Sequence, residues 1–105
     1  MLSSIFHLEQ PVVSPMSFGK DVVDEGTYGQ LFCIVTKGDE PFSFTWSLHG
    51  ETVHTEPSLT TNQIGGRTSM LTISSIGHRH IGKYTCTVSN AAGQVSQSTD
   101  LQVNG

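Results

Sequence analysis

Two cysteines, Cys33 and Cys86, limit most strongly what this chain can fold into: Cys33 is set in a run of large apolar residues, and Cys86 lies in the alternating segment "KYTCTVS". In an extended strand successive side chains point to opposite faces, so Leu31, Cys33 and Val35 share one face of "GQLFCIVTK". Only one disulfide can form, and closing the 53-residue loop would stabilise the fold by about 4 kcal/mol. Such a bridge indicates an oxidising compartment. The spacing alone leaves open the alternative of two separate buried thiols in a cytosolic protein.

Length and charge limit the classes of function. A chain of 105 residues is large enough for one core but not for two. Its net charge of −4, with only 5 lysines and arginines, argues against a surface for nucleic acid or anionic membrane. Residues 1–9 lack the basic start of a secretory signal, so we interpret them as a lead-in segment or an expression remnant. Residues 10–104 are then expected to form a single domain.

Turn-forming residues recur at short intervals and separate segments of roughly five to ten residues that are rich in β-branched and aromatic side chains. This rhythm predicts an all-β sandwich or barrel, and no segment shows helical periodicity. Alternation within the segments identifies the inward-facing residues. Those expected in the core are Leu31, Cys33, Val35, Phe42, Phe44, Trp46, Leu48, Leu71, Ile73, Ile76, Tyr84, Cys86, Val88, Thr99, Leu101 and Val103.

The spacing of three core residues resembles that of an immunoglobulin domain. Trp46 follows Cys33 by 13 positions, and Cys86 follows Trp46 by 40. "LTISSI" and "NAAG" are similar to the intermediate, or I-set, branch common in cell-adhesion molecules. The resemblance implies a sandwich of two antiparallel sheets, A-B-E-D and A'-G-F-C(-C'). It also implies a Cys33–Cys86 disulfide with Trp46 packed against it, and Tyr84 in the role of the tyrosine corner.

One departure from the family pattern narrows the resemblance. The usual motif is Asp-x-Gly-x-Tyr-x-Cys, but "HIGKYTC" has His80 in place of the aspartate. The ion pair that this aspartate would make with a basic residue such as Arg67 is therefore absent. With "KGDEP" and "SPMSFG", this is similar to the Dscam (Down syndrome cell adhesion molecule) family, in particular its variable seventh immunoglobulin domain and the first domain of shortened forms. That resemblance implies homophilic self-recognition by a neuronal or immune surface receptor with many isoforms.

Two short motifs could indicate other functions. His78 and His80 have the spacing of a metal-binding pair, but no carboxylate or cysteine lies nearby in sequence to complete a site, so we expect an exposed E–F turn and no metal. "KGD", Lys37 to Asp39, resembles an integrin-recognition tripeptide on an exposed loop. The same residues are also ordinary turn formers before Pro41.

An enzyme is not expected. A nucleophile needs an adjacent base and an oxyanion hole, and no motif for either occurs once both cysteines are assigned to a disulfide. No phosphate-binding glycine loop is present either, so we expect no cofactor and no small-molecule substrate. The chain has no Asn-x-Ser/Thr sequon, which leaves both faces of the predicted sandwich free of N-linked glycan.

The two outer faces of the predicted sandwich differ. The C–F–G face is expected to be uniformly polar, whereas Phe32, Ile34 and Met70 would form an apolar patch on the A–B–E–D face. Leu59 or Ile64, and a valine of Val12–Val13, could extend this patch. Such a patch usually marks an interaction site. The alternatives are cover by Ile5, Phe6 and Leu8, and scattered exposed apolar residues of the ordinary kind.

The sequence therefore predicts weak, two-fold homophilic association between cells through the A–B–E–D face of an extracellular I-set domain. Three polar residues beside the patch would select the matching isoform, namely Gln30, Thr68 and Thr72. One rival hypothesis is heterophilic binding by a surface or immune receptor. A second is a structural domain of an intracellular muscle-type protein.

Overall fold

The computed structural model describes residues 8–53 and 56–105, which form nine β-strands and one turn of 3-10 helix. The helical turn, His78–His80, precedes the eighth strand. Its length of one turn fits the absence of helical periodicity in the sequence. The strands are β1 (Val12–Val13), β2 (Val22–Asp24), β3 (Gly29–Lys37), β4 (Ser43–Leu48), β5 (Glu51–Thr52), β6 (Leu59–Ile64), β7 (Thr68–Ile73), β8 (Gly82–Asn90) and β9 (Gly93–Asn104).

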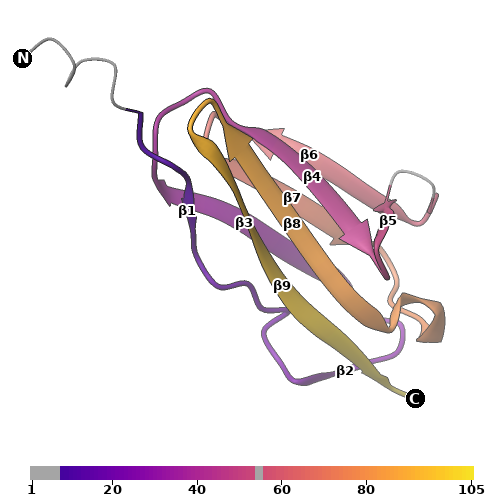
Figure 1. Ribbon diagram of the computed structural model, residues 1–105. Helices are drawn as coiled ribbons and strands as arrows, with labels where there is room; N and C mark the ends of the chain where they lie inside the picture. Colours follow the sequence, from indigo (N-terminus) through magenta and orange to yellow (C-terminus); the bar gives the residue numbers. More distant parts are fainter. Residues whose placement is uncertain (1–7, 54–55) are drawn as a thin grey trace, which may run out of the picture.

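The strands form two sheets that pack face to face (Figure 1). One sheet has the order β1-β3-β7-β6, and the other has the order β2-β9-β8-β4-β5. Neighbouring strands are antiparallel except β2 and β9, which run parallel. In the lettering of the family these are sheets A-B-E-D and A'-G-F-C-C', so the predicted immunoglobulin-like sandwich is confirmed.

Alternation along β3 creates the core on one side of the strand and an outer face on the other. Leu31, Cys33 and Val35 are buried, whereas Phe32 and Ile34 are exposed. Cys33 is joined to Cys86 of β8 by a disulfide with a Cα–Cα distance of 6.4 Å, which ties the two sheets together. Leu71 and Tyr84 are fully buried, as expected.

Two buried hydrogen bonds fix aromatic side chains within this core. Trp46 of β4 donates from Nε1 to Ser69 Oγ of β7, at 2.8 Å, and so links the two sheets. Tyr84 donates from its hydroxyl to the backbone oxygen of His80, at 2.7 Å. This is the tyrosine-corner contact, made to a residue four positions earlier in the chain.

The prediction of an exposed E–F turn is wrong for His80, whose side chain is 1% exposed. Its Nδ1 accepts a hydrogen bond from Gly77 N–H at 2.9 Å, so its Nε2 carries the proton and donates to Ser58 Oγ at 2.8 Å. Ser58 in turn donates to Glu56 Oε1. Both nitrogens of the buried ring thus have partners, and the one on Ser58, which is far away in the chain, cannot be inferred from the local sequence.

Candidate functional site

The outer face of the four-stranded sheet brings the predicted patch residues together. Phe32 of β3 is the register partner of Met70 of β7, which is in turn opposite Asn62 of β6. The next row on the same face runs Ile34–Thr68–Ile64, and the row on the other side runs Gln30–Thr72–Thr60. We call the outward-facing set of Val12, Phe32, Ile34, Ile64 and Met70 the apolar patch.

Exposure differs within this face. Phe32 is 40% exposed, Ile34 41%, Val12 47% and Ile64 51%, so four large apolar side chains of one sheet face meet solvent. Met70 and Thr68 are half-buried on the central strand β7, and Gln30 donates from Nε2 to Met70 Sδ at 3.4 Å. Thr72 is only 9% exposed, so its side chain offers little surface to a partner.

The structure selects between residues that the sequence left as alternatives. Ile64 extends the patch, whereas Leu59, at the other end of β6, is buried. Val12 points outward and Val13 inward, because Val13 pairs with the buried Val35. Leu8, one of the three residues expected to cover the patch in the alternative hypothesis, is exposed, and the other two, Ile5 and Phe6, lie outside the described residues.

The outer face of strands β4, β8 and β9 in the other sheet is polar, although Val22 of β2, at the edge of that sheet, is exposed. Hydroxyl groups pair across its strands: Thr85 Oγ1 lies 2.7 Å from Ser98 Oγ, and Thr87 Oγ1 lies 2.8 Å from Ser96 Oγ. None of the large apolar side chains exposed in the described residues comes from β4, β8 or β9. The two faces therefore differ as the sequence predicted, and the contrast makes the apolar patch the candidate binding surface.

Charge is confined to the border of this face. Strands β6 and β7 contain no ionisable residue, and Lys37 at the end of β3 is the only ionisable residue of that strand. At the β6–β7 turn Arg67 Nε lies 3.1 Å from Glu40 Oε2, and the same guanidinium lies over the ring of Phe42. Arg67 thus has an acidic partner although the family's aspartate is replaced by His80. A partner would meet a neutral surface with an ion pair at one corner.

The two histidines of "HRH" do not converge. His80 is buried with both ring nitrogens bonded, whereas His78 is exposed with Nδ1 3.5 Å from Glu25 Oε2. The described residues contain no group of three histidine, cysteine or acidic side chains arranged to hold a metal ion. The pair therefore forms structural contacts in this fold.

The tripeptide Lys37–Asp39 is tied to the start of the domain. Asp39 Oδ2 accepts a hydrogen bond from Glu9 N–H at 2.6 Å, and Asp39 N–H donates to Glu9 O at 3.2 Å. Gly38 is buried, and its oxygen accepts a hydrogen bond from Arg67 Nη2. The tripeptide is thus held in place and its carboxylate is engaged, so the integrin interpretation gains no support from its geometry.

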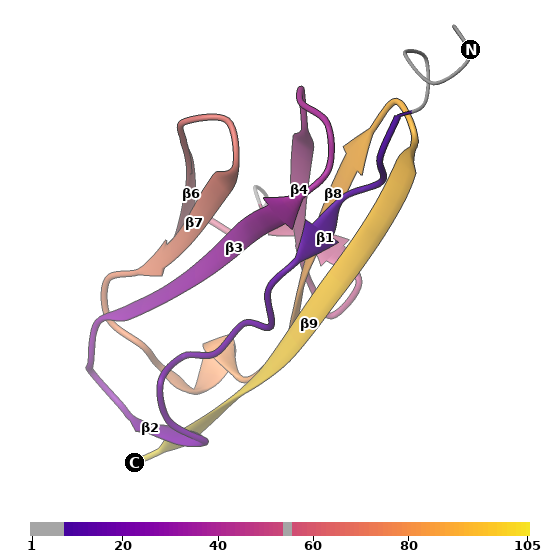
Figure 2. The same cartoon turned by 90° about the vertical axis from the view of Figure 1, so that its left-hand side faces the viewer.

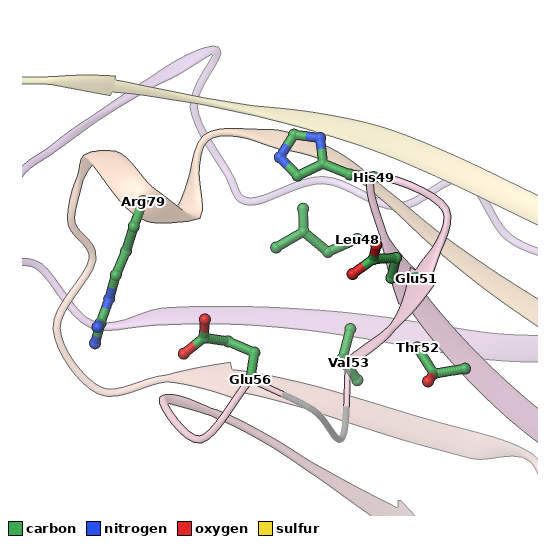
Figure 3. A pocket seen from close by; sticks show the side chains of 7 residues that line it. All are labelled: Leu48, His49, Glu51, Thr52, Val53, Glu56 and Arg79. Atoms are coloured by element: carbon green, nitrogen blue, oxygen red, sulfur yellow. The ribbon is translucent and has the colours of Figure 1, made fainter.

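A separate polar pocket of about 440 Å³ lies between the β4–β5 turn and the helical turn (Figure 3). Its lining residues are Leu48, His49, Glu51, Thr52, Val53, Glu56 and Arg79. Figure 3 shows Arg79 and Glu56 on one side and Glu51 on the other. Both cysteines are in the disulfide, so no thiol nucleophile is available here. Glu56 is occupied by hydrogen bonds from Ser58, which lower the pKa of its carboxyl.

The sequence and the fold together define the class of this chain. It belongs to the immunoglobulin domain family, whose profile matches residues 10–90. It is 39% identical over 95 residues to the cell adhesion molecule Dscam1 of Drosophila melanogaster, a match that covers 90% of this chain and 5% of that protein. The chain thus spans a small part of such relatives.

Solved structures give the same assignment. A crystal structure of the Dscam1 Ig7 domain, isoform 9, superposes with a TM-score of 0.84 at 38% identity, covering 90% of this chain and all of that one. A chimeric titin Z1Z2 structure superposes with a TM-score of 0.82 at 21% identity, covering 93% of this chain and 97% of that one, which shows the fold alone. No helix among the described residues is long and apolar enough to cross a bilayer.

Proposed function

We propose that this domain is an extracellular recognition module of a cell-adhesion receptor and that it binds a second copy of itself through the apolar patch. The observation that carries the proposal is the group of exposed apolar side chains on one sheet face, in contrast to the polar outer face of β4, β8 and β9 in the other sheet. The similarity to the cell adhesion molecule Dscam1 supports a location at the cell surface. The disulfide fits an oxidising environment, and the domain acts by binding and not by catalysis.

The energetics favour weak association. Fully burying one large apolar side chain contributes roughly 1.5–3 kcal/mol, and the patch side chains are already partly buried. Association costs on the order of 4–15 kcal/mol in lost freedom. Pairing of isolated domains should therefore be about micromolar or weaker, and many copies on apposed membranes would supply the avidity that adhesion needs.

The lack of charge on this surface also suits a two-fold dimer. Rotation about a two-fold axis places the same patch on both sides of the interface, and the face has no ionisable side chain within β6 and β7 to repel its copy. Gln30 and Thr68 border the patch and are partly or fully accessible, so they are the proposed determinants of isoform match. Thr72 contributes less, because it is buried.

The test is self-association of the purified domain measured by analytical ultracentrifugation. Phe32→Glu puts a charge on the exposed centre of the patch and should weaken the dimer at least about tenfold. Ser96→Glu adds the same charge to an exposed strand position of the other sheet and serves as the matched control. If both variants dimerise like the wild type while remaining folded, the proposal is wrong.

Two further measurements separate the rivals. Beads carrying this domain should clump with themselves, whereas a heterophilic receptor domain would need a second protein on the other bead. A thiol assay on native protein should detect no reactive cysteine, because Cys33 and Cys86 are joined. Two titratable thiols would instead favour the intracellular muscle-type alternative.

A further inference from the structure

The buried ring of His80 is a titratable group that the proposed binding surface does not use. It belongs to the helical turn His78–His80, which Figure 2 shows at the end of the domain where β2 and the C-terminus lie, away from the β6–β7 turn. The side chain is 1% exposed, and it accepts a hydrogen bond from Gly77 N–H at Nδ1 and donates one from Nε2 to Ser58 Oγ. The ring is therefore neutral in the folded domain.

A second proton on this ring conflicts with the fold at one atom. Nε2 already carries a proton, so the ring can take up another only at Nδ1. Gly77 N–H points at Nδ1 from 2.9 Å, and protonation would set two donors against each other. Gly77 is also the N-cap residue of the helical turn, so its hydrogen bond to the ring closes that turn. Protonation of the ring thus acts directly on the turn.

Two charged groups act on the ring, with opposite signs. Arg79, the preceding residue in the chain, disfavours a positive charge on the ring, whereas Glu56, which reaches the ring through Ser58, favours one. Burial has the largest effect, and together these influences lower the pKa of His80. Figure 3 shows Arg79 and Glu56 on the same side of the neighbouring pocket. The closed turn therefore disfavours the imidazolium form.

The other ionisable groups of the neighbouring elements are engaged elsewhere. Tyr84 of β8 donates its hydroxyl to the backbone of the helical turn, and burial raises its pKa, so it stays uncharged. Strand β9 packs against the turn, and its one ionisable residue, Asp100, is exposed and pairs in register with Lys83 of β8. His78 Nδ1 lies 3.5 Å from Glu25 Oε2. None of these groups offers a charge that holds the ring in its protonated form.

The turn can open without the sheets. Of residues 74–81, only Ile76 and His80 are buried, and the backbone hydrogen bonds within the helical turn are local, each joining residues three apart in the chain. The chain is anchored before the turn, where Ile76 N–H donates to Thr27 O, and after it, where Tyr84 is fully buried. A segment with few buried apolar contacts opens at a lower free energy than the whole domain unfolds.

We propose that the turn of residues 77–80 is an acid-sensitive latch, which is closed by the neutral ring of His80 and opens when Nδ1 takes up a proton, while the two sheets stay folded. In the open state the imidazolium leaves its buried position and is attracted by Glu56. That carboxylate is ionised in mild acid, because hydrogen bonds from Ser58 lower its pKa from 4.5. Histidine suits this role, since its charge changes in the mildly acidic range. The latch is separate from the apolar patch and does not depend on self-association.

Amide hydrogen exchange, followed by NMR and corrected for the intrinsic rate at each pH, tests the latch. The Gly77 amide should be less protected than the Val88 amide of the central strand β8, because the turn opens more often than the whole domain. Between about pH 7.5 and 5.5 the protection of Gly77 should fall by up to about tenfold, because the ring of the open turn regains its ordinary pKa of 6.5 and binds the proton.

His80→Asn is the matched variant. Its side-chain oxygen can still accept a hydrogen bond from Gly77 N–H, but it takes up no proton in this range, so the protection of Gly77 should be the same at both pH values. The proposal is overturned if Gly77 and Val88 are equally protected in the wild type, if acid leaves the protection of Gly77 unchanged, or if the variant shows the same loss. If the variant fails to fold, the two wild-type comparisons still decide.

Discussion

His80 Nε2 and Ser58 Oγ lie 2.8 Å apart, and this contact joins the turn before β8 to the segment before β6. The usual immunoglobulin motif has an aspartate at this position. Here the histidine forms hydrogen bonds through both of its ring nitrogens, to Ser58 and to Gly77. Ser58 passes the hydrogen bond on to Glu56 at 2.7 Å. A buried neutral imidazole therefore takes the structural place of a charged side chain.

Ser58→Ala should destabilise the domain by about 1–3 kcal/mol, because it leaves the buried Nε2–H of His80 without an acceptor. Guanidinium unfolding followed by tryptophan fluorescence measures this free energy. Ser74→Ala removes an exposed hydroxyl and should change it by less than about 0.5 kcal/mol. Equal effects from the two variants would show that the contact does not contribute.

Stability should fall on mild acidification because of His80. Burial lowers the pKa of His80 below its ordinary 6.5, the nearby Arg79 charge lowers it further, and Glu56 opposes this. The unfolded chain then binds the proton first, so the stabilisation is full above about pH 6.5 and declines as pH falls toward the folded-state pKa. The free energy of unfolding measured between about pH 7.5 and 5.5 should decrease with this sign.

The change of unfolding free energy with pH, and not its absolute value, identifies His80 as the group responsible. His80→Asn removes the titrating ring and should flatten the slope. Glu56 acts in a separate window, because its pKa is lowered from 4.5 and its contribution is lost only at more acidic pH. Parallel slopes for the wild type and His80→Asn would contradict the assignment.

The hydrogen bond from Trp46 to Ser69 should contribute measurably, since it crosses between sheets in the core. Ser69→Ala leaves a buried indole N–H unpaired and should cost about 1–3 kcal/mol in unfolding free energy. Ser96→Ala removes a hydroxyl of similar hydrogen-bond length, 2.8 Å to Thr87, on the exposed face. Water replaces that partner, so the control should lie within about 0.5 kcal/mol of the wild type.

Gly38→Ala should destabilise more than Gly19→Ala, as measured by denaturant midpoints. Both glycines have positive φ, 118° and 95°, so both substitutions carry the backbone cost of roughly 1–2 kcal/mol. A Cβ on Gly38 would also lie 2.9 Å from Gln10 O and Pro11 Cα, whereas a Cβ on Gly19 meets nothing within 4 Å. Equal losses of stability in the two variants would show that the backbone at Gln10 and Pro11 moves to accommodate the added methyl group.

Much of the fold could be predicted from the sequence because the strands alternate in polarity. The inward sets around Cys33 and Cys86 are buried as expected, and Phe32 and Ile34, although apolar, lie on the outer face because successive side chains of a strand point to opposite sides. The patch could be predicted only as a set of alternatives. Whether Ile64 or Leu59 faces outward depends on where β6 meets β7, which no local pattern encodes.

The sequence by itself indicated an all-β fold and the contrast between a polar and an apolar face, since period-two alternation is a local property, and its resemblance to the immunoglobulin family implied the sandwich and the disulfide. Only the tertiary structure decided that His80 is buried, that Trp46 bonds to Ser69, and that Thr72 is largely hidden. It also revealed that Ile64 is exposed on β6 while Leu59 is buried. These features depend on contacts between segments far apart in the chain, whose geometry is set when the two sheets pack.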